Sequence, residues 1–402
     1  MDLASDLAAA ATLRLQELGR GQPAGPARHE ANPLFPRLEG WLNAYLGPAT
    51  ASFHGIQGNG LVAIPDENRN AIIPARTYEM GGRTYYLSIK GCGAYEDMFH
   101  GGELTPDHIA NACRDPGLLP RVKRLATGAG FIMGESWMGE SPFGAQGERN
   151  ARDELAISAL APGASINGAL ICPVIGIVPL AGPIEDVARK FYWVRQHPEP
   201  FYQEMRLVPS RTRLYFESSQ VLADPGAALA TFGIDTAARI EQFEKAFIKS
   251  GIALLTLFTR SAKLHAGEVT GIIYRDVWLD KDAIVAPDGA IHFCDLEGLV
   301  WQGTPLDSAA QVQLAEWNKL FFEFAYALVQ VDTFRHELEN GDAAISWGRQ
   351  RDVLASIIQD AMESDPFACT RYDGDQLVAI IEHPDIPSIP QARVPLLQGL
   401  RG

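Results

Sequence analysis

The patterning of the chain changes near Glu217, and this change limits the possible folds more than any other feature of the sequence. Before this point, glycine turns separate short runs rich in aromatic and β-branched residues, such as residues 83–89, which is typical of strands. After it, apolar residues recur at helical spacing along residues 236–264. A strand-rich half followed by a helix-rich half predicts an α+β fold with two lobes and a cleft between them.

Local patterns divide the two halves further. We expect an N-terminal helical extension and linker over 1–50, a β-rich lobe over 51–217 with a glycine-rich insertion at 94–147, and a helical lobe over 218–402. The expected helices are residues 3–19, 34–46, 149–160, 236–264, 308–331 and 343–362, and the expected strands are residues 83–89, 169–180 and 212–217.

Composition excludes several kinds of partner. The 402 residues include 49 acidic and 34 basic side chains, a net charge of −15 without a Lys/Arg cluster, so the phosphate attraction of a nucleic-acid binder is missing. The longest apolar stretch, residues 168–182, is too short to span a membrane. The five scattered cysteines form no CxxC motif, which argues against a disulfide framework or a zinc site. We therefore expect a cytoplasmic protein with no membrane span.

Residues 271–298 carry the strongest indication of chemistry. Asp282 precedes and Asp295 follows two short apolar runs that are joined by a Pro-Asp-Gly turn, a pattern that predicts a β-hairpin. The hairpin brings both carboxylates to one end, where they can hold one cation, and Asp276 enters the same region from the preceding loop. Phosphoryl transfer from a metal nucleotide needs these parts: two oxygen ligands for Mg²⁺ and a carboxylate that orients the acceptor hydroxyl.

This segment resembles the catalytic loop and metal-binding segment of the protein-kinase-like superfamily. The resemblance implies that Asp276 is the catalytic aspartate and that Asp282 and Asp295 stand at the family's metal-binding Asn and DFG Asp. Two features differ from the family pattern: one extra residue lies between Asp276 and Asp282, and Asp-Leu-Glu-Gly replaces Asp-Phe-Gly. An aspartate in place of asparagine adds negative charge, so Mn²⁺ is an alternative to Mg²⁺.

Lys90 is the candidate that would hold the α/β phosphates of ATP. It ends an otherwise apolar strand, where a lysine is costly to bury without an anionic partner. In the kinase-like fold, a helix glutamate and the nucleotide phosphates provide that partner. Glu154, on the expected helix 149–160, is the first choice for this glutamate, and Glu148 is the second.

Two further segments are candidates for nucleotide contacts. Gly55, Gly58 and Gly60 lie between strand-compatible residues, where backbone amides can approach phosphates because no Cβ intervenes. A plain β-turn is the alternative interpretation of these glycines. The backbone around Glu217, at the expected hinge between the lobes, would hydrogen-bond the edge of the adenine.

Residues 83–93 and 142–180 are similar to the selenoprotein O family, a kinase-like branch that transfers AMP and binds its nucleotide inverted. That family lacks the Tyr-Arg-Asp found here at residues 274–276. We therefore expect transfer of the γ-phosphate of ATP to the hydroxyl of an unidentified acceptor, whether a small molecule, a lipid or a protein. Two alternatives stay open: an AMP transferase, and a pseudokinase scaffold that binds nucleotide without turnover.

Overall fold

The computed structural model describes residues 30–35, 62–63, 70–90, 146–179, 200–214, 225–261, 263–274 and 277–305, together with some residues between 316 and 341. It divides into two compact units. The first unit lies within Met1–Ala164 and Ile171–Arg211, and the second within Ser165–Leu170 and Thr212–Gly402. The two units therefore divide between residues 211 and 212, and a short segment from the first half, Ser165–Leu170, belongs to the second unit.

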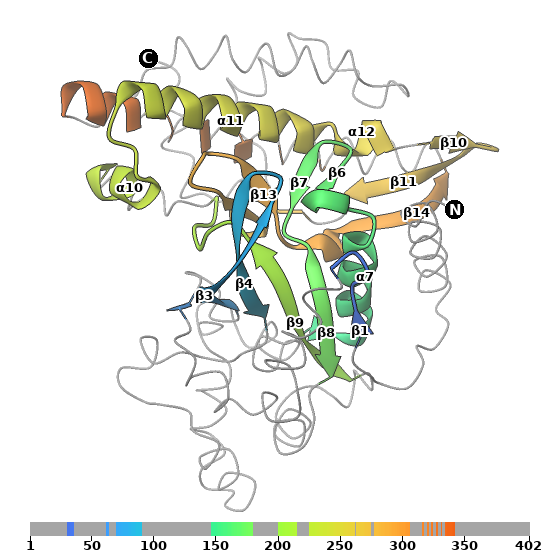
Figure 1. Ribbon diagram of the computed structural model, residues 1–402. Helices are drawn as coiled ribbons and strands as arrows, with labels where there is room; N and C mark the ends of the chain where they lie inside the picture. Colours follow the sequence, from blue (N-terminus) through green and yellow to red (C-terminus); the bar gives the residue numbers. More distant parts are fainter. Residues whose placement is uncertain are drawn as a thin grey trace, which may run out of the picture. The chain divides into compact units, whose positions relative to one another are not determined.

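The first unit is built on a seven-stranded antiparallel sheet with the order β1-β8-β9-β4-β3-β2, and β5 pairs with β9. The helix α7 (Glu148–Ser158) lies along β8 and β9 (Figure 1). The strands are β1 (Glu30–Ala31), β2 (Val62–Ala63), β3 (Asn70–Met80), β4 (Arg83–Lys90), β5 (Gln146–Gly147), β8 (Val174–Pro179) and β9 (Phe201–Val208).

The two faces of this sheet differ in polarity. On one face, Leu87 and Ile89 of β4 pair with Leu207 and Met205 of β9, and these side chains belong to the apolar core. Because successive side chains of a strand point to opposite faces, the residues between them lie on the other face. That other face carries buried polar side chains, namely Asn70, Ser88, Lys90, Glu204 and Arg206.

Two sequence expectations for the first unit are confirmed at the level of elements. The strand over residues 83–89 is β4, and the helix over 149–160 is α7. The single strand expected over 169–180 is instead two strands, β7 (Ala169–Ile171) and β8, which belong to different sheets. The break falls at Cys172–Pro173, where proline has no N–H to donate to a ladder. The strand β9 was not expected.

The second unit combines helices with two small sheets, so the described chain has an α+β fold. One sheet has the order β10-β11-β14 and the other β12-β13-β7-β6. The strands are β6 (Ser165–Ile166), β7, β10 (Lys263–His265), β11 (Glu268–Tyr274), β12 (Ala283–Val285), β13 (Ile291–Phe293) and β14 (Leu299–Pro305). The helices are α10 (Pro225–Phe232), α11 (Ala237–Leu255), α12 (Leu257–Ser261) and α13 (Leu279–Asp282).

The long helix α11 organises the core of the second unit (Figure 1). Thr236 caps its N-terminus by accepting a hydrogen bond from the Arg239 N–H. Its buried face includes Phe243 and Phe247 at the predicted helical spacing, and Phe247 stacks on Phe324, with ring centroids 5.4 Å apart. The described residues between 316 and 340 are helical, which agrees in part with the helix expected over 308–331.

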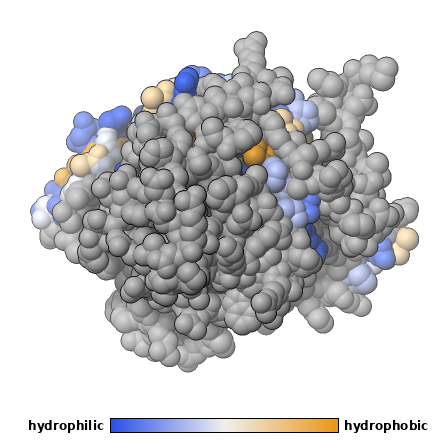
Figure 2. Space-filling view, turned by 90° about the horizontal axis from the view of Figure 1, so that it is seen from below, coloured by the Kyte–Doolittle hydropathy of each residue, from blue (hydrophilic) through white to orange (hydrophobic). Residues whose placement is uncertain are grey.

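Other expected elements are either shorter than expected or lie outside the described residues. The strand expected over residues 212–217 is reduced, among its described residues 212–214, to a single β-bridge between Arg213 and Ile284. The helices expected over 3–19 and 343–362, most of the helix over 34–46, and the insertion up to residue 145 lie outside the described residues. In the described part of the chain, no helix combines the length and hydropathy needed to cross a bilayer. On the face shown in Figure 2, described hydrophobic residues reach the surface in small groups among hydrophilic ones.

The predicted β-hairpin is present as β12 and β13, paired from Ala283–Phe293 to Val285–Ile291. Its turn packs against α11 so closely that a Cβ on Gly289 would overlap the backbone carbonyl of Phe243. Gly289 also has a φ of +93°, a conformation that residues with a Cβ rarely adopt.

Gly289→Ala should therefore lower the free energy of unfolding by about 3 kcal/mol or more, because backbone strain and steric overlap add. Gly267→Ala is the matched control, since Gly267 has a φ of +84° but no atom near the site of a Cβ. Its expected cost is about 1 kcal/mol. Chemical denaturation of both variants measures the difference, and equal costs would show that the contact with Phe243 is unimportant.

Candidate functional site

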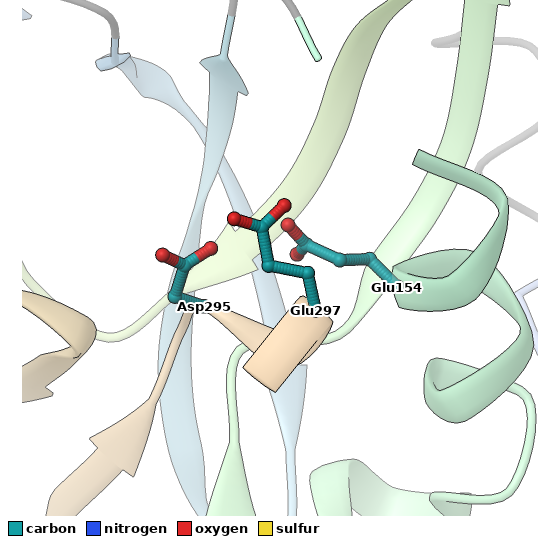
Figure 3. A group of neighbouring side chains, drawn as sticks. All are labelled: Glu154, Asp295 and Glu297. Atoms are coloured by element: carbon teal, nitrogen blue, oxygen red, sulfur yellow. The ribbon is translucent and has the colours of Figure 1, made fainter. Parts of the chain in front are cut away.

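Lys90 and Glu154 form the ion pair that the sequence predicts. The Nζ atom of Lys90, at the end of β4, lies 3.3 Å from Oε1 of Glu154 on α7. Both side chains are buried, with 3% and 0% of their surface exposed. Figure 3 shows the Glu154 side chain extending from α7. The pair joins residues 64 positions apart, so it depends on the way α7 packs on the sheet.

Glu154 has further partners in the first unit. Its Oε1 accepts a hydrogen bond of 2.7 Å from the Gln146 amide, and its Oε2 accepts one of 3.0 Å from Arg206. Arg206 also forms an ion pair with Glu204. We call Lys90, Glu154, Glu204 and Arg206 the buried charge cluster. It contains two cations and two carboxylates, and this balance makes it tolerable to bury four charges together.

Glu148, the second choice as a partner of Lys90, is engaged elsewhere. It accepts a hydrogen bond of 3.0 Å from the Nε of Arg152, one turn further along α7. Arg152 also forms an ion pair with Glu30, and so links α7 to β1. Of the two glutamates considered, Glu154 is therefore the one that pairs with Lys90.

Asp153, next to Glu154 on α7, has a clearly displaced pKa. Burial raises its pKa to about 6, although the Arg149 guanidinium, 3.9 Å away, acts in the opposite direction. Since the pKa is higher in the folded state than in the unfolded chain, ionisation of Asp153 reduces stability as the pH rises through this value.

In the second unit, the hairpin brings the chain at Asp282 and Asp295 together, as the sequence predicts. The Cys294 N–H, one residue before Asp295, donates a hydrogen bond of 2.6 Å to the Asp282 carbonyl. Asp282 is 2% exposed, and its Oδ2 accepts a hydrogen bond of 2.7 Å from the Trp278 N–H. A carboxylate has about four lone-pair sites, so this hydrogen bond is compatible with a second role as a metal ligand.

Glu297 is a candidate ligand that the sequence reasoning missed. Asp295 immediately precedes the short 3₁₀ turn η7 (Leu296–Gly298), which contains Glu297. A carboxylate oxygen of Asp295 lies within 4.8 Å of one of Glu297, and Figure 3 shows both groups directed to the same side of the turn. Two such oxygens can share one divalent cation. The signal in the sequence is the Asp-Leu-Glu spacing, in which Glu297 follows Asp295 by two positions.

The pairing of β11 with β14 brings together the two ends of the segment between Tyr274 and Leu299, whose sequence includes Asp282, Asp295 and Glu297. Tyr274, the last residue of β11, is paired with Leu299, the first residue of β14. The Tyr274 hydroxyl donates a hydrogen bond to the Leu254 carbonyl of α11, and burial raises the pKa of this phenol. Asp276 itself lies outside the described residues. In the sequence it follows Tyr274 by two positions, and Glu297 precedes Leu299 by two. Because Tyr274 and Leu299 are paired, the chain leaves the sheet and returns to it at neighbouring points.

The remaining sequence-predicted residues also lie outside the described part of the chain. These are Gly55, Gly58, Gly60 and Glu217. Their assignment to phosphate and adenine contacts stays a prediction.

Comparisons with known proteins give no match from which a function could be transferred. No protein-family model matches the sequence, and no curated protein or solved structure matches it significantly. The function must therefore be inferred from the residues and their geometry.

Proposed function

We propose that the chain is an ATP/Mg²⁺-dependent phosphotransferase with a bilobal, protein-kinase-like arrangement. The observation that carries the proposal is the buried ion pair between Lys90 and Glu154. A lysine at a strand end that is held by a helix carboxylate is oriented to bind phosphate oxygens as a fixed positive charge. Asp295 and Glu297 supply carboxylates for Mg²⁺, or Mn²⁺, with Asp282 as a further ligand. Asp276 receives or orients the proton of the acceptor hydroxyl.

The proposal requires Lys90 and the carboxylates of Asp295 and Glu297 to bind the same nucleotide. Catalysis then consists of positioning and charge neutralisation: Lys90 neutralises phosphate charge and Asp276 aligns the acceptor oxygen. Asp295 and Glu297 would hold the metal, which would supply further positive charge beside the phosphates. The γ-phosphorus forms a bond to that oxygen, the bond to the β-phosphate oxygen breaks, and ADP leaves. The acceptor is a hydroxyl of a small molecule, a lipid or a protein.

Parallel reactions with ATP labelled in the α- or the γ-phosphate test this proposal. Purified chain is incubated with Mg²⁺ and either label, with water and the chain itself as acceptors. We expect the γ label to appear as phosphate or on the chain, and the α label to stay in ADP. Label from the α position on the chain would indicate AMP transfer instead. Binding of Mg·AMP-PNP in calorimetry without transfer of either label would indicate a nucleotide-binding scaffold.

Lys90→Met is the variant that links this activity to the proposed site. Glu154 keeps Gln146 and Arg206 as partners in this variant, so the fold should persist. We expect the affinity for Mg·AMP-PNP to fall about tenfold or more, because a charge-assisted contact to phosphate is lost. Lys245→Met, an exposed lysine of α11, is the control and should bind normally. Equal binding by both variants would contradict the assignment of Lys90.

A further inference from the structure

Three consecutive backbone amides in the second unit each donate a hydrogen bond to a different carboxylate. The Val277 N–H donates to Oε2 of Glu316, at 3.2 Å. The Trp278 N–H donates to Oδ2 of Asp282, at 2.7 Å, and the Leu279 N–H donates to Oε2 of Glu323. These amides lie immediately after Asp276 in the sequence.

Placing three carboxylates around one tripeptide costs free energy, and this cost needs an explanation. Asp282 and Glu323 are only 2% and 7% exposed, and buried carboxylates are destabilising unless hydrogen bonds compensate for lost hydration. Their like charges also repel one another. Hydrogen bonds from N–H groups to ionised carboxylates are stronger than those to neutral acceptors. The arrangement therefore holds the backbone of residues 277–279 more tightly than neutral side chains would.

Glu316 and Glu323 are themselves held in fixed positions. Both residues are helical, like the other described residues between 316 and 340, and both carboxylates reach the same tripeptide, residues 277–279. Leu320 and Phe324 of this helical region are fully buried, and Phe324 stacks on Phe247 of α11. A Cβ on Gly251 of α11 would overlap the Phe324 ring, so α11 closely approaches this side chain. Apolar packing thus locates the helix that carries both carboxylates.

The chain is anchored on both sides of Asp276. Before it, the Tyr274 side chain is fully buried and hydrogen-bonded to α11. After it, the three carboxylates hold residues 277–279. We propose that Glu316, Glu323 and Asp282 form a carboxylate clamp whose role is to position Asp276. This role rests on the proposed function, in which Asp276 aligns the acceptor hydroxyl. Glu316 and Glu323 are positioning residues that act through the backbone, and Asp282 combines this role with that of a metal ligand.

The clamp is tested by hydrogen exchange and kinetics on the full chain. Glu316→Leu and Glu323→Leu remove an acceptor, whereas Glu323→Gln keeps an acceptor oxygen without the charge. In peptides covering residues 274–280, we expect both leucine variants to exchange about tenfold faster than wild type, and Glu323→Gln to show an intermediate rate. Glu339→Leu is the control because Glu339 is a half-exposed residue of the same helical region, and it should exchange at the wild-type rate.

Kinetics decide whether the clamp positions Asp276. We expect kcat for phosphate release from ATP to fall about 10²-fold in Glu323→Leu, with KM for ATP within about twofold of wild type and partial recovery in Glu323→Gln. Unchanged exchange in both leucine variants would overturn the clamp. Faster exchange with unchanged kcat would overturn its positioning role. Faster exchange in a chain whose wild type turns over no ATP would support the clamp and reject the proposed function. Glu316 is only half-buried, so its variant tests the clamp even if Glu323→Leu does not fold.

Discussion

Replacing Glu154 by leucine should lower the free energy of unfolding by about 3–5 kcal/mol, because it removes the carboxylate shared by two buried cations. Lys90 and Arg206 both contact this carboxylate, and Glu204 is then the one acidic member of the buried charge cluster. Urea denaturation followed by circular dichroism measures the loss. This is the largest effect on stability that we expect from changing one charged side chain in the cluster.

Two controls separate burial from the mere loss of an ion pair. Glu241→Leu removes an exposed pair with Lys245 on α11, 2.6 Å long, and should cost less than about 1 kcal/mol. Lys90→Met combined with Glu154→Leu removes one cation and one carboxylate together, so Arg206 and Glu204 remain as a balanced pair. The double variant should be more stable than Glu154→Leu alone. A double variant that is less stable would mean that packing, not charge balance, determines the effect.

Asp295→Asn should reduce transfer of the γ-phosphate by about 10²–10³-fold while leaving the protein folded. Asparagine keeps the shape of the side chain and one oxygen, but its neutral oxygen binds a divalent cation more weakly than a carboxylate. The loss should appear as a higher Mg²⁺ concentration needed for half-maximal activity. Initial rates across a Mg²⁺ titration give both quantities.

Asp288→Asn is the matched control, since Asp288 lies at the turn of the same hairpin and is exposed. Its activity and its Mg²⁺ dependence should be those of wild type. The double variant of Lys90→Met and Asp295→Asn tests whether both residues serve one nucleotide. Residues that act on the same site give losses that are far from additive, whereas independent sites give additive losses. Additive losses would contradict a shared nucleotide.

Several features of the fold could be predicted because they depend on neighbouring residues. The Pro-Asp-Gly turn predicted the hairpin β12–β13, since glycine supplies the positive φ at position 289. The spacing of Phe243 and Phe247 predicted the buried face of α11. The break between β7 and β8 could also be predicted from Pro173, because proline cannot continue a ladder. The apolar residues on both sides, however, are typical of one continuous strand.

The strand β9 could not be recognised in the same way. Its Glu204 and Arg206 are buried in the middle of a sheet, where a pattern based on polarity expects apolar residues. Glu316 and Glu323 present the same difficulty on a helix whose other described positions nearby are apolar. Arg206 is compensated by Glu154 of α7, and Glu316 and Glu323 accept hydrogen bonds from backbone amides of residues 277 and 279. Neither composition nor periodicity identifies these partners from other parts of the chain.

The sequence by itself determined the local elements and the chemical character of the candidate residues: a strand ending in Lys90, a helix bearing Glu154, and a hairpin with aspartates at its open end. Only the tertiary structure decided which of these charges meet within each unit. It paired Lys90 with Glu154 across 64 positions, added Arg206 across 52, and set Glu297 beside Asp295. The physical reason is that backbone conformation follows from adjacent residues, whereas Coulomb attraction and hydrogen bonding depend on distance in space, which packing establishes.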